Sequence, residues 1–148
     1  DIIDGTFIIK KSKFDKIGFF DENIFIYFEP WDLSKRVINS GEKLYVCDKI
    51  KFEHLGGQSH EPKFNYEATL SRNWHYCWSK FYYLRKYSNY INAMRKTLPI
   101  LIRALSKSIK YKFFNDKKLY KIHMAEVRGL ISAYFLKKST YRPYDLQK

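Results

Sequence analysis

The distribution of glycine divides this 148-residue chain into two unlike parts. Five of the six glycines lie in the first sixty residues, whereas residues 66–138 contain only Gly129. A long stretch almost free of glycine, with periodic apolar residues, is typical of helix, while the earlier part alternates short strand and helix patterns. We therefore expect one compact region, residues 1–65, followed by a helical extension, residues 66–148.

The first part predicts an α/β fold with a short mixed sheet. The segments TFIIK, KLYVC and IKFEHL have the β-branched and aromatic content of strands. KSKFDKIG predicts a short helix with Ser12 as its N-cap and Gly18 at its end. A second helix is expected from Pro30 to the sequence NSG, because the first helical turn needs no amide donor at the proline.

The second part predicts three helices. Their expected ranges are residues 68–87, 90–113 and 117–138. Pro99 is expected to kink the second of them, because proline removes one hydrogen bond of the helix.

Composition limits the classes of function. The formal net charge is +13, which favours polyanionic partners such as nucleic acid, nucleotide phosphates or an anionic lipid surface. Cys47 and Cys77 lack the paired spacing of a zinc knuckle or a disulfide framework, and no stretch is apolar enough for a membrane span. The chain begins at Asp1 rather than at a methionine, and the strand-like segment GTFIIKK follows at once, so we expect the chain to be a piece of a longer protein.

Acidic residues gather around the expected start of the second helix. Asp21, Glu29 and Asp32 lie within twelve positions of one another. Such acids act as a general base, bind a cation, or cap and charge-balance the helix. His54 follows an expected strand and precedes small residues that allow a ligand to approach backbone amides.

Four segments in order resemble the C-terminal half of bacterial family 2 glycosyltransferases, the rhamnosyltransferase-like enzymes of the GT-A fold that build surface polysaccharides. The segments are residues 5–9 (GTFII), 14–22 (FDKIGFFDE), 29–36 (EPWDLSKR) and 54–59 (HLGGQS), and WSKFYY at residues 78–83 follows them. The resemblance implies the C-terminal part of a Rossmann-like GT-A domain in residues 1–65, with the nucleotide-binding half missing. No Asp-x-Asp motif occurs in the chain, so the isolated segment is expected to be inactive.

The activity implied by the resemblance is inverting, metal-dependent sugar transfer. The donor would be a nucleotide-sugar and the acceptor a saccharide or a polyprenyl-linked saccharide. The second acid of the family's Glu-Asp pair takes the proton of the acceptor hydroxyl, and His54 would help to hold Mg²⁺ or Mn²⁺ on the donor diphosphate.

The usual base position is occupied here by Pro30, which has no titratable group. One hypothesis is that Glu29, the preceding residue, takes over as the base. A second is that Asp32 serves, and a third is that the chain is a non-catalytic relative.

The resemblance also implies further binding residues. Those for the acceptor are Asp21, Glu22 and Trp31, and those for the donor are Arg36, Gly56, Gly57 and Ser59. Two simpler interpretations remain open. Asp21 caps its loop by accepting backbone hydrogen bonds, and Arg36 forms an ion pair with Asp32 at i+4.

The helix expected over residues 90–113 is amphipathic, with apolar residues on one stripe and basic residues on other faces. One interpretation is that the stripe packs on neighbouring helices. The other is attachment to an anionic membrane surface, which the lipid-linked acceptors of the family favour. It corresponds to a cytoplasmic protein, peripheral on the inner face of the cell membrane.

The alternative from another class is a basic nucleic-acid-binding module with aromatic side chains for stacking. No known nucleic-acid-binding motif occurs, and the acids near Glu29 would repel phosphate. We therefore do not expect nucleic acid as a partner.

Overall fold

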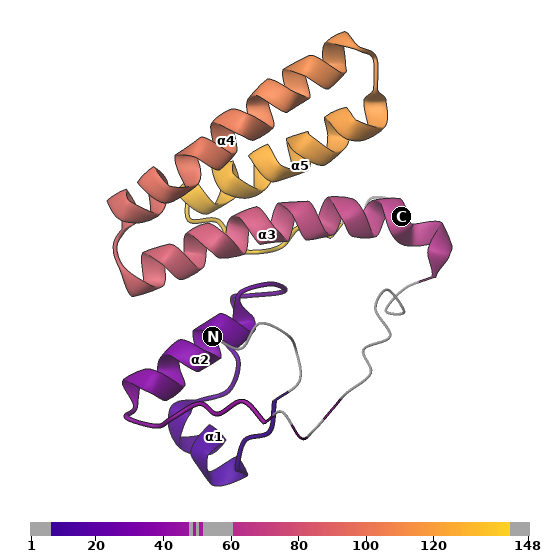
Figure 1. Ribbon diagram of the computed structural model, residues 1–148. Helices are drawn as coiled ribbons and strands as arrows, with labels where there is room; N and C mark the ends of the chain where they lie inside the picture. The colour runs from indigo at the N-terminus through magenta and orange to yellow at the C-terminus, as the bar shows by residue number, and fades with distance from the viewer. Residues whose placement is uncertain (1–6, 48, 50, 52–60, 143–148) are drawn as a thin grey trace.

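The computed structural model describes residues 7–47, 49, 51 and 61–142, and these residues form helices and loops. The helices are α1 (Lys11–Ile17), α2 (Glu29–Asn39), the short 3-10 helix η1 (Pro62–Phe64), α3 (Asn65–Tyr87), α4 (Tyr90–Phe113) and α5 (Lys117–Tyr134) (Figure 1). The part of the chain that the structure describes is therefore all-helical.

The prediction of an α/β fold with a short mixed sheet, and of the GT-A architecture with it, is wrong. Within the described residues, the predicted strands at 7–10 and 43–47 have no regular secondary structure. Tyr45 and Val46 are 84% and 99% exposed. Strand-forming side chains stabilise a strand only by packing on neighbours, and these side chains face solvent instead. Most of the third predicted strand lies outside the described residues.

The five predicted helices are confirmed, although α3 begins three residues earlier than predicted, at Asn65, and α5 ends at Tyr134 rather than at residue 138. Gly18 ends α1 with a φ of 89°, which a residue without a Cβ adopts readily. Ser12, however, is not the N-cap, because the helix begins one residue earlier, at Lys11, and Lys10 precedes it. Pro30 lies in the first turn of α2, and α4 runs through Pro99.

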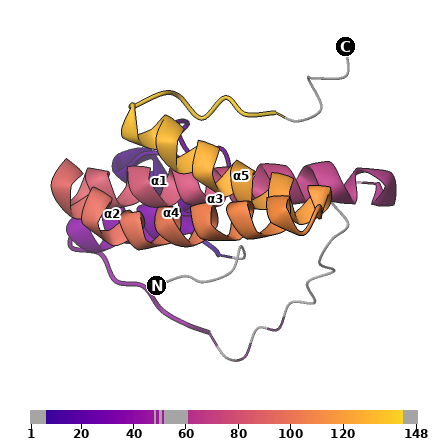
Figure 2. The same cartoon turned by 90° about the horizontal axis from the view of Figure 1, so that it is seen from above.

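Helices α3, α4 and α5 form one antiparallel layered unit (Figure 2). Helix α5 packs against both α3 and α4, and its Gly129 permits the close approach to α3. A Cβ built on Gly129 would lie 2.3 Å from the Trp74 carbonyl oxygen. The buried apolar cluster of this unit consists of Trp74, Cys77, Trp78, Phe81, Ala93, Ala125, Leu130 and Ala133.

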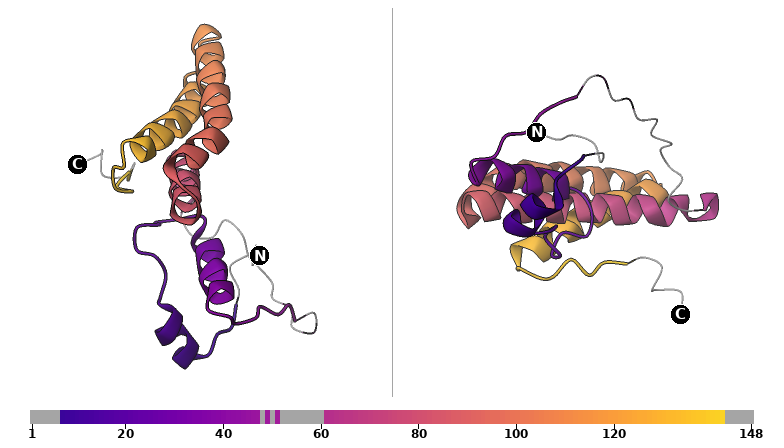
Figure 3. Two further views of the ribbon diagram at one scale, coloured as in Figure 1. Left: turned by 90° about the vertical axis from the view of Figure 1, so that its left-hand side faces the viewer. Right: turned by 90° about the horizontal axis from the view of Figure 1, so that it is seen from below.

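The N-terminal region, residues 7–47, lies on the side of α3 opposite α4 and α5 (Figure 3). Its loop between α1 and α2 contacts α3 directly, since the Ser79 hydroxyl donates a hydrogen bond of 2.9 Å to the Ile26 carbonyl oxygen. Helix α3 is therefore the platform on which the loop and α2 are positioned. None of the described helices is long and apolar enough to cross a lipid bilayer.

Candidate functional site

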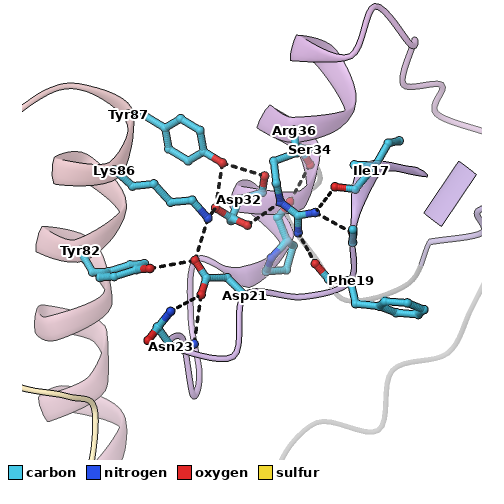
Figure 4. Close-up of polar contacts among 12 residues, drawn as sticks. Ile17, Phe19, Asp21, Asn23, Asp32, Ser34, Arg36, Tyr82, Lys86 and Tyr87 are labelled. Carbon is cyan, nitrogen blue, oxygen red and sulfur yellow. Dashed lines mark hydrogen bonds and ion pairs between the residues drawn. The ribbon is translucent and has the colours of Figure 1, made fainter. Parts of the chain in front are cut away.

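A network of charged side chains joins α2 and its preceding loop to the end of α3 (Figure 4). The Lys86 ammonium lies 2.7 Å from Asp21 Oδ2 and 2.6 Å from Asp32 Oδ1. One lysine of α3 thus binds two carboxylates that lie eleven positions apart in the N-terminal region. We call Asp21, Asp32, Arg36 and Lys86 the charged bridge.

Asp32 is completely buried within the charged bridge. Its Oδ2 accepts a hydrogen bond of 2.9 Å from Arg36 Nε, and its Oδ1 accepts one of 2.8 Å from the Tyr87 hydroxyl, in addition to the contact with Lys86. The predicted ion pair of Arg36 with Asp32 is therefore confirmed. Both carboxylate oxygens have partners, so Asp32 is placed to hold α2 on α3 rather than to accept a substrate proton.

Arg36 also closes the end of α1. Its guanidinium donates hydrogen bonds to the carbonyl oxygens of Ile17 (3.0 Å), Gly18 (2.6 Å) and Phe19 (2.6 Å). With Nε on Asp32, each nitrogen of the guanidinium is engaged by the protein itself. This arrangement favours a structural role for Arg36 over the predicted contact with donor phosphates.

Asp21 caps its loop, as the simpler interpretation predicts. Its Oδ1 accepts hydrogen bonds from the backbone and side-chain amides of Asn23, and its Oδ2 accepts one of 2.9 Å from the Tyr82 hydroxyl. Burial opposes ionisation, but the hydrogen bonds from Lys86 and Asn23 outweigh it and lower the pKa of Asp21 from 3.8 to about 2. The neighbouring Glu22 is exposed.

Glu29 differs from both aspartates. It is the first residue of α2, and its Oε2 is buried without a hydrogen-bond partner among the described residues. A buried carboxylate oxygen without a partner is costly, so such a group is a candidate for binding a ligand. Pro30 follows with no amide proton, and its carbonyl accepts a hydrogen bond of 2.7 Å from Ser34 Oγ.

The backbone before Glu29 is strained. Tyr27 and Phe28 have φ values of 67° and 71°, in the left-handed region that side chains with a Cβ rarely adopt. Two consecutive residues of this kind are costly and cluster at functional sites. Burial of Phe28 and its ring contacts with Trp31 and Tyr83, at centroid distances of 4.8 and 5.5 Å, hold this conformation.

An open hollow of about 300 Å³ lies beside this strained segment, between the loop and α3. Its lining residues are Tyr27, Thr69, Arg72, Asn73 and Tyr76. Burial raises the pKa of Tyr27, the charge of Arg72 lowers it and the charge of Glu29 raises it. The carboxylate and the guanidinium therefore both act on the phenol that lines the hollow.

The groups around the hollow suit a polyhydroxylated ligand. Arg72 and Asn73 offer N–H donors, and Tyr27 and Tyr76 offer aromatic faces with their ring centroids 5.7 Å apart. The predicted acceptor residue Trp31 is 39% exposed and packs edge-on against Tyr83. The hollow therefore offers hydrogen-bond donors and aromatic faces to a ligand, and Glu29, whose Oε2 has no partner among the described residues, lies two positions from Tyr27 in the chain.

The described residues do not fit a divalent cation. They contain no group of three histidine, cysteine or acidic side chains placed to hold a metal. The two acids of the charged bridge, Asp21 and Asp32, already share the Lys86 ammonium, which repels a cation. The metal ligand predicted at His54, and the predicted donor-binding residues Gly56, Gly57 and Ser59, lie outside the described residues and stay predictions.

Sequence reasoning missed the α3 side of the hollow, although a signal for it exists. Thr69, Arg72, Asn73 and Tyr76 follow the spacing i, i+3, i+4, i+7, which places four polar-ended side chains on one face of a helix.

Comparison of the chain with protein-family models, with curated proteins and with solved structures finds no match. The case for a function therefore rests on the geometry of the hollow and on the motifs of the sequence.

Proposed function

We propose that this chain is part of an inverting glycosyltransferase, in which Glu29 is the general base and the hollow beside it binds a saccharide acceptor. The observation that carries the proposal is the buried carboxylate oxygen of Glu29, which lacks a partner among the described residues next to a hollow lined by hydrogen-bond donors and tyrosines. The resemblance of EPWDLSKR to the acidic motif of the family supports the same assignment from the sequence.

In the proposed reaction, an acceptor hydroxyl lies in the hollow and donates a hydrogen bond to Glu29. As the hydroxyl oxygen attacks the anomeric carbon of the nucleotide-sugar, its proton passes to the Glu29 carboxylate. A carbon–oxygen bond to the acceptor forms, and the bond from the anomeric carbon to the donor phosphate breaks. The nucleoside diphosphate leaves with the bonding electron pair from the opposite face, which inverts the configuration.

Pro30 has a positive role in this proposal. It lies in the first turn of α2, where no helical hydrogen bond is lost, and limits the backbone freedom of Glu29, because the residue before a proline is restricted in its conformations. Arg72 and Asn73 would bind neighbouring hydroxyls of the acceptor and hold the reacting hydroxyl at the carboxylate.

The test is sugar transfer by the complete gene product that contains this chain. Glu29→Gln removes the proton acceptor with little change in shape, so kcat should fall by about 10²–10⁴-fold with KM for the acceptor little changed. Arg72→Gln should raise that KM instead. Glu61→Gln is the matched control, because Glu61 is exposed and pairs with Lys63.

Full activity of Glu29→Gln would contradict the proposal. A wild-type protein that binds saccharides but transfers no sugar would support the non-catalytic relative instead.

A further inference from the structure

Helix α4 packs Met94, Ile100 and Leu101 partly against the core, but its buried positions are small residues and its other large apolar residues are exposed. Its fully buried residues are Ala93, Thr97, Ala104 and Ser108. Its large apolar residues Ile91, Ile102 and Ile109 are 70%, 56% and 68% exposed. A helix of a globular domain is expected to bury its large apolar residues instead. Of the apolar residues predicted to pack on neighbouring helices, Leu101 does pack against the core, whereas Leu98, Ile102, Leu105 and Ile109 are exposed.

Six exposed apolar residues of α4 form a stripe along one face of the helix. It consists of Ile91, Leu98, Ile102, Leu105, Ile109 and Phe113. At 3.6 residues per turn these positions fall within an arc of roughly 80° over the length of the helix. We call this set the apolar stripe, and it faces away from the small residues that contact the rest of the helical unit.

Basic residues flank the apolar stripe, and acids are absent from this part of the sequence. No Asp or Glu occurs between Glu67 and Asp116. The exposed cations of α4 are Arg95, Lys96, Arg103, Lys107, Lys110 and Lys112. Arg103 lies 3.6 Å from Glu126 of α5, and the others add positive charge to the edges of the stripe.

The stripe ends in an aromatic tip at the turn between α4 and α5. Phe113 and Phe114 are 86% and 68% exposed, with their rings edge to face at 5.7 Å. Lys110, Lys112 and Lys117 are exposed around them. In Figure 1 this turn lies at the end of the helical unit away from the N-terminal region.

We propose that the apolar stripe and the aromatic tip form a docking surface for an anionic lipid bilayer. An exposed apolar face with cations at its edges matches the boundary between acyl chains and negatively charged headgroups. Nucleic acid would leave the isoleucines and phenylalanines without a partner. A second copy of the chain would bring two basic faces together, and the charge of those faces opposes such a dimer.

The experiment is co-sedimentation of the full chain with lipid vesicles. One set contains phosphatidylcholine alone and the other contains equal parts of phosphatidylcholine and phosphatidylglycerol. The chain is expected to bind the anionic vesicles at low salt and to be released from them largely, but not completely, as the salt concentration rises. Binding to the neutral vesicles should be weak.

Two double variants separate the apolar and the charged contributions. Ile102→Ser with Ile109→Ser should lower the vesicle affinity by at least about tenfold at every salt concentration. Lys110→Gln with Lys112→Gln should lower it roughly fivefold for each lost charge, at low salt only. Because all four side chains are exposed, the far-UV circular dichroism should not change.

Matched controls lie in the N-terminal region. Ile38→Ser with Val46→Ser removes exposed apolar side chains, and Lys11→Gln with Lys35→Gln removes exposed charges. Both controls should bind anionic vesicles like the wild type.

Three results would overturn the proposal: no binding to anionic vesicles at low salt, equal loss in the controls and the stripe variants, or a dimer in light scattering that the isoleucine variant abolishes while vesicles go unbound. Salt-dependent binding of a generic oligonucleotide without vesicle binding would overturn it in favour of nucleic acid.

Discussion

The N-terminal region and the helical region, residues 65–142, are held together by different forces. The helical region has a continuous apolar core with two tryptophans and a phenylalanine. In the N-terminal region the described buried apolar residues are Ile24, Phe28, Leu33 and Val37. That region is fixed to α3 by the charged bridge, by hydrogen bonds such as that of Ser79, and by aromatic contacts of Tyr27 and Phe28 with tyrosines of α3.

The candidate site combines residues of both regions. Apolar packing on α4 and α5 holds α3 in place. Hydrogen bonds and ion pairs then fix the position of the loop on α3. The hollow lies where the two kinds of structure meet, with Tyr27 from the loop and Arg72 from the platform. Glu29 therefore lies in the N-terminal region, which has the smaller apolar core and which also contains the strained residues Tyr27 and Phe28 and the buried Asp32.

The largest expected effect is that of a core truncation in the helical region. Phe81 is 1% exposed, and its ring meets those of Tyr90 and Tyr134 at 5.4 and 5.0 Å. Phe81→Ala should lower the free energy of unfolding by about 3–5 kcal/mol in urea titration. Phe113→Ala, at an exposed position, should change it by less than about 0.5 kcal/mol. Similar losses for the two variants would contradict the account of the core.

A somewhat smaller effect is expected from neutralising the charged bridge. Asp32→Asn keeps the side-chain shape but leaves Arg36 and Lys86 without their buried counter-charge, although Lys86 retains Asp21. The expected loss is about 3 kcal/mol, confined to the attachment of α2. Hydrogen exchange should show faster exchange in α2 with α4 and α5 unchanged.

The control for that variant is Asp15→Asn, an exposed acid of α1, which should leave exchange in α2 as it is. Equal loss of protection in all helices would mean that the two regions unfold as one cooperative unit, which would contradict a separate attachment of α2.

The smallest effect is a difference in pH dependence between the regions. Burial lowers the pKa of His75 from 6.5 to about 4, although its Nε2 hydrogen bond of 2.9 Å to the Tyr141 carbonyl oxygen favours the charged form. Because the unfolded state binds the proton more readily, the helical region should lose stability as pH falls from about 6.5 to 4, at roughly 1 kcal/mol per pH unit. Asp21 affects stability at a lower pH than His75 does, because the stabilisation from its ionised carboxylate is lost only as pH falls from about 4 to 2.

Urea titrations at pH 7 and pH 5 measure this difference. His75→Gln should flatten the dependence in that interval, whereas Asp21→Asn should not. An unchanged slope in His75→Gln would show that another group is responsible.

The helices were predictable from the sequence and the sheet was not, for a physical reason. Helical hydrogen bonds are local, so the spacing of apolar residues, Pro30 and Gly18 carry the information within a few positions. A strand depends on a partner elsewhere, and the composition of KLYVC cannot show whether one is present. The ion pair of Arg36 with Asp32 follows from i+4 spacing, whereas the link to Lys86 spans more than fifty positions and has no local signal.

The most direct test of the proposed saccharide site is an NMR titration of the chain with short oligosaccharides of the type found in surface polysaccharides. The account predicts chemical-shift changes at Tyr27, Arg72, Asn73 and Tyr76, weakened in Arg72→Gln and unaffected in Arg85→Gln. Shifts absent from these residues, or gathered on α4 instead, would contradict the account.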